Sequence, residues 1–328
     1  MGSGYYDSGA TARLRSAKTV ESTSKGYDAS SVKTFTYHAD VASGRASGIH
    51  PGLDPAKMKD GRRESRDSVE HPNSNPVAVC IDVTGSMSSY PKVLFDDIGS
   101  LMSAIVKNDA LSDPQVLYAA VGDAACDRYP FQVGQFESDN KSEAQISDVI
   151  LEGGGGGNDF ESYDLWMYFL ARCTATDAFE KRGKKGYAFL IQDEPPPHKL
   201  PKSHVKSVFD QTIQEDIPFA NIVAEAKERW DIFILRPLET SYGRRENVTK
   251  EWEKLFPDRV FPLQTVKGIA GQIAMIIANE EGADLDSIAD TLISTGVSRE
   301  IALMAKDNVV KKGGGLVKAK GGEEIDLS

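Results

Sequence analysis

The stretch VAVCIDVTGS, residues 77–86, decides the fold because an uninterrupted apolar run turns abruptly into a polar loop. Five apolar residues in a row (77–81) are typical of a strand that is buried on both faces of a parallel sheet. The loop that follows carries a carboxylate and two hydroxyls, and apolar residues then recur at helical spacing from Leu94 to Ile105. The stretch therefore predicts a buried strand, a polar loop at its carboxyl end and a helix.

The same alternation of apolar strands and helical patterns continues along the chain to about residue 283. Repeated strand-helix-strand units favour an α/β fold, namely a doubly wound, mostly parallel open sheet with helices on both faces. Helices are expected over 146–151, from about 159 to 173, and over 269–277. Further strands are expected over 116–121, 131–136, 187–191, 232–235 and 260–263, of which 131–136 alternates like an edge strand.

Two flanking segments differ in composition from this α/β region, which we place at residues 76–283. Residues 1–75 are rich in Gly and Ser and predict an extended N-terminal arm, in which Val32–His38 alternates like a strand. Residues 284–328 predict a short helical hairpin followed by a flexible tail. Gly296 lies between the two expected helices, where glycine commonly ends a helix.

Composition narrows the classes of function. The 328 residues include 38 Lys and Arg against 49 Asp and Glu, which gives a formal charge of -11. Such a charge disfavours nucleic acid and anionic membranes as partners, and suits a protein that holds a cation. No apolar run approaches the ~20 residues of a membrane span. The start of the chain does not resemble a signal peptide, and Cys80, Cys126 and Cys173 form no CxxC pair, so we expect a cytoplasmic protein without a disulfide framework.

Oxygen-bearing side chains follow two of the expected strands and a glycine run, Gly153–Gly157. In open α/β sheets, ligands bind beyond the carboxyl ends of the strands. Carboxylate, hydroxyl and amide oxygens without thiols suit Mg²⁺ best, with Mn²⁺ or Ca²⁺ as alternatives, and do not suit Zn²⁺. The candidate metal ligands are Asp82, Thr84, Ser86, Asp193 and one of Asn158 or Asp159.

These residues carry a resemblance to a known family. The DVTGS of residues 82–86 resembles the DxSxS motif of von Willebrand factor type A (vWA) domains, and Asp193 is similar to the late aspartate of that family. The block GGGGGNDFE, residues 153–161, resembles the GGGGDxxE loop of a bacterial and phage-type subgroup. The resemblance covers roughly residues 76 to 283. It implies a vWA/Rossmann-like fold with a metal-ion-dependent adhesion site (MIDAS), in which Asn158 or Asp159 takes the place of a threonine.

The resemblance and the residues favour a protein-binding module without catalysis. Relatives in the subgroup often work in protein complexes, some beside an AAA+ ATPase. A Mg²⁺-dependent phosphatase is the alternative, with Asp82 as nucleophile and with Asp193 and Glu194 holding the ion. Such enzymes use a second aspartate as general acid where Thr84 stands here. A structural or assembly subunit of a phage or bacterial complex is a third hypothesis. In the simplest explanation without a site, Asp82 and Ser86 only cap the following helix.

Overall fold

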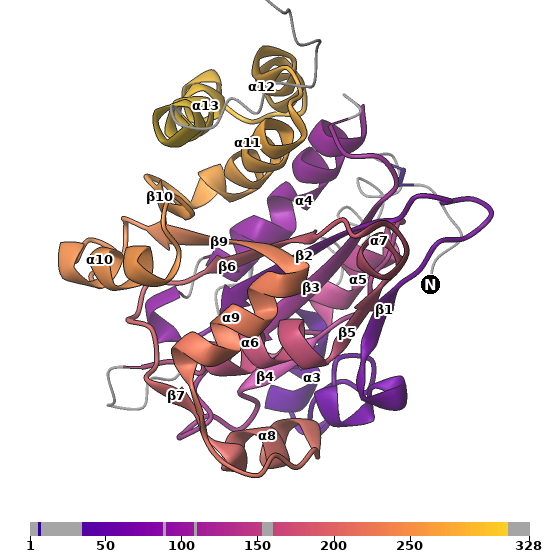
Figure 1. Cartoon of the computed structure of the whole chain (residues 1–328), viewed down its shortest axis with the longest axis vertical. Coiled ribbons are helices and arrows are strands. Elements are labelled where there is room, and N and C mark those ends of the chain that lie inside the picture. Colours follow the sequence, from indigo (N-terminus) through magenta and orange to yellow (C-terminus); the bar gives the residue numbers. More distant parts are fainter. Residues whose placement is uncertain (1–5, 8–34, 88–89, 108–109, 153–159, 314–328) are drawn as a thin grey trace, which may run out of the picture.

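A computed structural model describes residues 6–7, 35–87, 90–107, 110–152 and 160–313. The chain forms a mixed α/β fold around a six-stranded sheet in the order β10-β9-β6-β2-β3-β4 (Figure 1). Neighbouring strands pair in parallel, except that the edge strand β4 is antiparallel to β3. The strands are β2 (Asn75–Asp82), β3 (Pro114–Val121), β4 (Phe131–Val133), β6 (Gly186–Ile191), β9 (Trp230–Pro237) and β10 (Val260–Leu263).

Helices cover both faces of this sheet (Figure 1). Alternate residues of β2 point to opposite sides, so Val77 and Val79 join one apolar cluster while Ala78 and Cys80 join the other. The first cluster includes α4 and α11, and the second includes α6 and α9. The α/β class predicted from the sequence is therefore confirmed. The covering helices are α4 (Tyr90–Lys107), α6 (Tyr163–Arg172), α9 (Phe219–Arg229) and α11 (Ile269–Glu281).

Shorter elements fill the connections between these strands and helices. In the described ranges, no helix combines the length and the apolar character needed to cross a membrane. The helix expected over 146–151 lies earlier, and the helix expected from 159 begins at Tyr163. The shorter helices are α5 (Lys141–Ser147), α7 (Asp177–Arg182), α8 (Lys202–Phe209) and α10 (Glu246–Leu255), with 3-10 turns at Pro55–Lys57, Lys59–Gly61, Gly85–Met87 and Val266–Gly268. Two small sheets pair β1 (Arg63–Ser65) with β5 (Thr174–Thr176), and β7 (Lys199–Leu200) with β8 (Ile217–Pro218).

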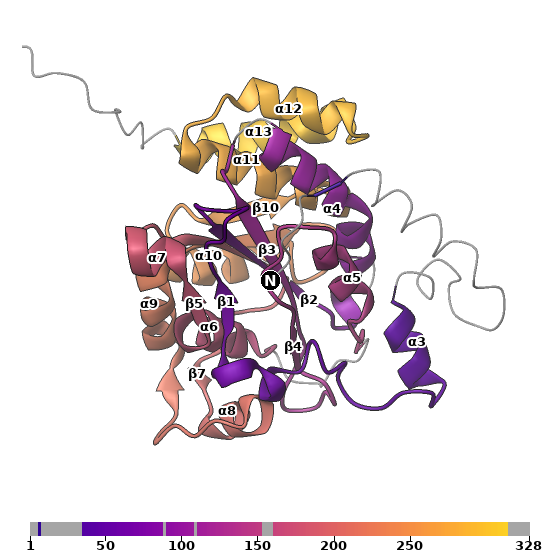
Figure 2. The same ribbon diagram turned by 90° about the vertical axis from the view of Figure 1, so that its right-hand side faces the viewer.

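The segment before β2 packs against the α/β body. Phe35 is 1% exposed within the apolar cluster that holds α4 and α11. The Arg63 side chain donates hydrogen bonds to the backbone oxygens of Gly52 (2.7 Å) and Val133 (2.9 Å). The strand expected over Val32–His38 is wrong where the structure describes it, because Thr36–Ala42 forms the helix α3 at the edge of the molecule (Figure 2).

The physical reason for this difference is that burial of Phe35 fixes the segment, whereas α3 itself buries no residue. The side chain of His38 instead accepts a hydrogen bond at Nδ1 from the backbone N–H of Leu151, at 3.2 Å. An alternating pattern forms a strand only where a neighbouring strand offers its edge. Residues 32–34 lie outside the described part of the chain.

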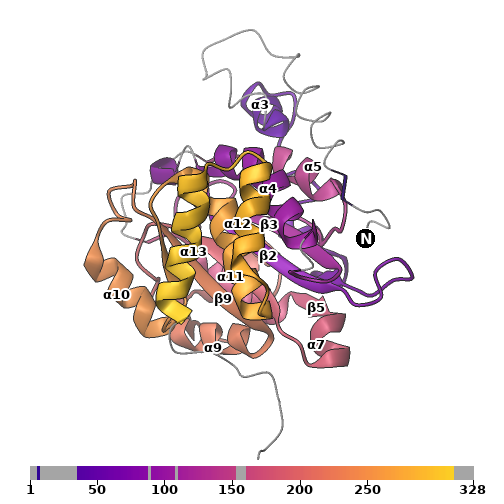
Figure 3. The same cartoon turned by 90° about the horizontal axis from the view of Figure 1, so that it is seen from above.

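The two C-terminal helices expected from the sequence are present as α12 (Leu285–Ser294) and α13 (Arg299–Gly313). They lie beside each other over α11 (Figure 3). Gly296, between them, has a φ of +105°, which a residue with a side chain rarely adopts. Leu292 and Ala302 are fully buried, so the hairpin shares the main core. The tail expected to be flexible lies outside the described residues.

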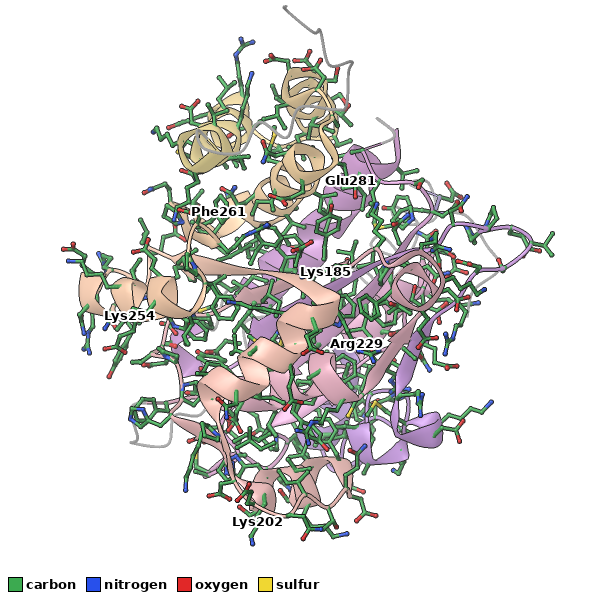
Figure 4. All side chains as sticks on the ribbon, viewed as in Figure 1. Lys185, Lys202, Arg229, Lys254, Phe261 and Glu281 are labelled. Atoms are coloured by element: carbon green, nitrogen blue, oxygen red, sulfur yellow. The ribbon has the colours of Figure 1, made fainter. Side chains whose placement is uncertain are left out.

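Charged side chains cover the outer surface, as Lys202 on α8 and Lys254 on α10 illustrate (Figure 4). Some of them connect distant elements. Glu281, at the end of α11, accepts a hydrogen bond from the Tyr187 hydroxyl of β6 at 2.7 Å and pairs with Lys184 at 2.6 Å. These contacts tie α11 to the amino end of the sheet, opposite the strand ends that carry the candidate ligands.

Asp67 links the N-terminal segment to α7 in the same way. Its carboxylate accepts hydrogen bonds from Arg182 (2.8 Å), Lys181 (3.2 Å) and the Ser74 hydroxyl (2.8 Å). Burial alone would raise the pKa of Asp67, but these donors outweigh it and lower the pKa to about 2. The charged form of Asp67 is therefore favoured in the folded state.

Phe35→Ala should lower the free energy of unfolding by about 3 kcal/mol, because it removes a buried aromatic ring and leaves a cavity. Urea unfolding at neutral pH measures this change. Val69→Ala is the control, since Val69 is 96% exposed, and we expect it to stay within about 0.5 kcal/mol of the parent protein. Equal stability of the two variants would contradict the anchoring role of Phe35.

Asp67→Asn should lower the free energy of unfolding by about 1 kcal/mol at neutral pH. This is less than the lowered pKa alone would give, because solvent screens the Lys181 and Arg182 partners. The folded-state pKa lies below the ordinary value of 3.8. The contribution is thus complete above about pH 4 and disappears as the pH falls through about 2. Urea unfolding at several pH values should show the two proteins converging in acid. Asp210→Asn, at an exposed pair with Lys206, should change stability little at any pH.

Candidate functional site

The candidate ligands lie where the order of the strands reverses. From β2 the chain adds β3 and β4 on one side of the sheet, and then adds β6, β9 and β10 on the other. At such a switch point the connections leave adjacent strands in opposite directions, and a crevice opens beyond the carboxyl ends. Asp82 is the last residue of β2, and Asp193 follows the end of β6 by two residues. The topology therefore brings these two carboxylates to the same end of the sheet.

Asp82 is completely buried and both of its carboxylate oxygens accept hydrogen bonds. Its Oδ1 accepts from the backbone N–H of Thr84 at 2.8 Å and from the Thr84 hydroxyl at 2.5 Å. Its Oδ2 accepts from the Tyr163 hydroxyl at 2.7 Å. The polar loop after β2 thus folds back onto the carboxylate that precedes it, and the start of α6 supplies the third donor.

Asp193 is also completely buried, but its two oxygens differ. Oδ1 accepts a hydrogen bond from the Ser86 hydroxyl at 3.1 Å, which joins the loop after β2 to the loop after β6. Oδ2 is buried and meets no hydrogen-bond donor in the described part of the chain. The Thr240 hydroxyl is near enough to lower the pKa of Asp193, but it donates its own hydrogen to the backbone oxygen of Pro237 at 3.2 Å.

These hydrogen bonds leave specific lone pairs available to a cation. A hydroxyl that donates its hydrogen to a carboxylate keeps two acceptor lone pairs. Thr84 and Ser86 both donate in this way, and Ser86 is exposed to solvent. Together with Oδ2 of Asp193, these two hydroxyls are the oxygen donors that the loops after β2 and β6 offer. This donor set fits Mg²⁺ or a similar ion.

Acidic side chains are concentrated at these strand ends. Burial raises the pKa of Asp82 to about 7, although the bonds from Thr84 and Tyr163 oppose the shift. Burial also raises the pKa of Asp193. Glu161, just before α6, has its pKa raised to about 9 by burial and by the charges of nearby carboxylates, Asp82 first among them. Its Oε2 is buried and has no hydrogen-bond partner in the described residues. Ionisation of such a group of acids is unfavourable unless a cation neutralises the negative charge.

A buried arginine fixes the backbone at the end of β6. Arg236 is 1% exposed, and its guanidinium donates to the backbone oxygens of Asp193 (3.0 Å) and Tyr242 (2.9 Å). The Trp252 indole donates to the backbone oxygen of the next residue, Glu194, at 2.9 Å. The position of the Asp193 carboxylate is thus set by side chains from β9 and α10. The sequence pattern predicts a role at this site for neither Arg236 nor Trp252.

The structure joins four of the candidate ligands in two hydrogen-bonded pairs, Thr84 with Asp82 and Ser86 with Asp193. Asn158 and Asp159 lie outside the described residues. Among the residues that are described, no group of three or more His, Cys, Asp or Glu side chains has metal-binding geometry. The described part of the site therefore depends on two carboxylates and two hydroxyls. Sequence reasoning missed Glu161, although it is part of the quoted block 153–161, and missed Tyr163.

Comparisons with known proteins add little to this geometry. No family model matches the chain, and no curated protein matches it. Among solved structures, the pilus adhesin SpaC from Lactobacillus rhamnosus GG, in its open conformation, matches over 70% of this chain and 31% of its own, with 9% identity and a TM-score of 0.44. Proximal thread matrix protein 1 from the mussel byssus matches over 62% and 48%, with 11% identity and a TM-score of 0.39. The chain thus spans less than half the length of either protein, and similarity at this level bears on neither ligand nor activity.

Arg236→Lys should lower the free energy of unfolding by about 2 kcal/mol, because a lysine cannot satisfy the same backbone oxygens from one planar group. Urea unfolding measures the change. Arg244→Lys, in the loop after β9, is the matched control, since the bonds that Arg244 donates to the backbone oxygens of Thr240 (3.2 Å) and Glu239 (3.4 Å) are longer, and we expect a change of about 0.5 kcal/mol or less. Equal losses in the two variants would show that Arg236 has no special role at the strand end.

Proposed function

We propose that the chain is a metal-ion-dependent protein-binding module of the vWA type. The observation that carries the proposal is the buried Oδ2 of Asp193, which has no donor in the described residues and belongs to the carboxylate that accepts a hydrogen bond from Ser86. Buried polar atoms in folded proteins almost always have a partner, and an exception needs an explanation. A divalent cation supplies that partner.

The topology supports the finer description of the fold as doubly wound and vWA/Rossmann-like. Counted along the chain, the six strands of the sheet take the order 3-2-1-4-5-6, with the reversal between the first and the fourth. The third is the antiparallel edge strand. Ligands of such sheets bind at the reversal, which here is the crevice between Asp82 and Asp193.

The proposed ion is Mg²⁺, with Mn²⁺ and Ca²⁺ as alternatives. Thr84, Ser86 and Asp193 would hold it directly, and Asp82 would hold it directly or through water. One of Asn158 or Asp159, as the resemblance implies, and Glu161 would complete the charge balance. Mg²⁺ keeps several waters when it binds to few carboxylates, so positions remain for an oxygen from a partner. When bound, the ion supplies a positive centre on an otherwise acidic face.

The proposed partner is a protein that offers a carboxylate or another oxygen to the ion. The net charge of -11 would repel an acidic partner in the absence of the cation, so association should depend on the metal. Work in a larger complex, in some relatives beside an AAA+ ATPase, comes from the resemblance alone.

The geometry of Asp82 disfavours the phosphatase alternative. A nucleophilic carboxylate must present an oxygen to phosphorus, but Asp82 is 0% exposed and its oxygens accept from Thr84 and Tyr163. Thr84 also stands where a phosphatase of this type needs a general acid. No described contact favours the assembly-subunit alternative over the binding module.

Millimolar Mg²⁺ should raise the melting temperature of the protein, since an ion at 100 times its dissociation constant stabilises the folded state by about 2.7 kcal/mol. Asp193→Asn should abolish the increase, because it removes the charge of the orphaned oxygen. Asp231→Asn is the control: Asp231 lies on β9 at the opposite end of the sheet, and its variant should keep the full increase. A melting temperature indifferent to Mg²⁺, Mn²⁺ and Ca²⁺ would contradict the site.

The same variants separate binding from catalysis. A partner isolated with the native protein should be released by a chelator and should not bind the Asp193→Asn variant. Hydrolysis of a simple phosphate ester that is lost in Asp82→Asn would favour the phosphatase instead. Capture that persists in chelator would move the binding surface away from the strand ends.

A further inference from the structure

The loop after β9, residues 238–245, is joined to the candidate metal site. β9 runs parallel to β6, so this loop leaves the sheet at the same end as the loop that carries Asp193. The buried guanidinium of Arg236 connects the two loops, because it donates to the backbone oxygens of Asp193 (3.0 Å) and Tyr242 (2.9 Å). The loop after β9 therefore has a defined position beside the strand end that holds Asp193.

Contacts within the loop fix its backbone. The Thr240 hydroxyl donates to the backbone oxygen of Pro237 at 3.2 Å and accepts from the backbone N–H of Gly243 at 3.0 Å. A Cβ atom at Gly243 would lie 1.6 Å from the Pro237 oxygen, so glycine is needed for this close turn. The backbone N–H of Arg245 then donates to the Tyr242 oxygen at 2.9 Å. The position of Arg245 is thus set by the backbone of the loop itself.

Arg245 and its neighbour Arg244 use their guanidinium groups differently. The central carbon of the Arg245 guanidinium lies over the Tyr242 ring, 3.8 Å from its centre. Stacking on a ring occupies the face of the guanidinium and leaves the N–H donors, which lie in its plane, available. Arg244 instead donates to the backbone oxygens of Thr240 and Glu239. Both arginines are exposed, and among the described residues neither pairs with a carboxylate.

Stability of the fold does not explain the arginine at position 245. Arg245 is the N-cap residue of α10, and its side chain makes no capping hydrogen bond. A positive charge there is unfavourable for the helix, because the helix dipole is positive at its N-terminus. The chain as a whole carries a net charge of -11, so an arginine with free donors beside the acidic site is an exception. Its available donors suit a carboxylate that comes from outside the chain.

We infer that Arg245 binds a second carboxylate of the same partner that offers an oxygen to the ion, so that the partner presents an acidic segment with two carboxylates. The inference rests on the proposed function. A planar guanidinium can bind a carboxylate through two parallel hydrogen bonds, which adds orientation as well as affinity. The ion alone accepts an oxygen from many partners. Two contacts at a fixed separation select an acidic segment whose carboxylates have the matching spacing.

The test uses fluorescent peptides in a Gly/Ser background that carry either one glutamate or two glutamates at varied spacing. Their binding to the full chain in millimolar Mg²⁺ is measured by fluorescence anisotropy. The best peptide with two glutamates should bind about tenfold more tightly than the peptide with one, as expected for one additional charge-assisted contact. Arg245→Gln should remove this difference. Arg245→Lys, which keeps the charge but loses the planar group, should reduce it to about threefold.

Arg244→Gln is the matched control. It removes the same charge from the adjacent exposed residue, but the Arg244 guanidinium already donates to the backbone of its own loop. This variant should keep most of the tenfold difference, which separates a direct contact from general attraction by positive charge. Because Arg245 is exposed, the melting temperature of Arg245→Gln without metal should match that of the parent protein.

Equal affinity for the peptides with one and two glutamates would overturn the inference, and release of both by a chelator would leave the proposed function intact. Equal losses in Arg244→Gln and Arg245→Gln would also overturn it, because charge alone would then explain the preference. Binding that persists in chelator but is lost in Arg245→Gln would support the arginine contact and overturn the metal site. Absence of binding to every peptide, with or without Mg²⁺, would overturn both.

Discussion

The parallel pairing of β2 with β3 on one side and β6 on the other is the interaction on which the rest of the structure depends. It places alternate side chains of β2 into two separate apolar clusters, so helices must cover both faces. It also aligns Ile81 with Ile191 and Asp82 with Val121, which sets the strand ends level with one another. The residues that follow β2 and β6 consequently meet at the same end of the sheet, where Ser86 donates a hydrogen bond to Asp193.

These strand ends bury two acidic side chains. Asp82 and Asp193 are completely buried, and the guanidinium of Arg236 donates to the backbone oxygen of Asp193. Burial raises the pKa of both acids, and the charge of Asp193 adds to the shift of Asp82, which means that folding opposes their ionisation. A divalent cation relieves this repulsion, and under the proposed function the unfavourable charge is retained because it creates affinity for the ion.

Much of this arrangement follows from the sequence, because its causes are local. A continuous apolar run at residues 77–81 requires a strand buried on both faces, and a polar loop after it must lie at the strand end. The position of Asp193 follows by the same reasoning. Short or weakly apolar elements could not be predicted from the sequence. The helix α3 depends on where Phe35 is buried, and the pairing of β1 with β5 joins segments more than a hundred residues apart.

Tyr163 and Arg236 show why the remainder of the site could not be read from the sequence. Tyr163 stands at the head of an apolar helix, where a tyrosine is most simply a core residue, and only the packing of α6 against β2 directs its hydroxyl to Asp82. Arg236 lies near the end of an apolar strand, where an arginine is expected to be exposed to solvent. It is only 1% exposed, because the loop after β9 folds over it. Both roles depend on contacts between elements distant in the sequence.

Under the proposed function, the hydrogen bonds at the strand ends also explain how a binding site can exist without weakening the fold. Thr84 donates to Asp82 and Ser86 donates to Asp193 from the loop after β2, and the buried Tyr163 hydroxyl adds a further donor to Asp82. The same bonds orient the free lone pairs of these hydroxyls before any ligand arrives. Binding then requires little further ordering of side chains, and preorganisation of this kind reduces the entropic cost of association. Under the proposed function, different atoms of the same few residues serve stability and binding: the hydrogens of the hydroxyls hold the loops, and their lone pairs are available to the ion.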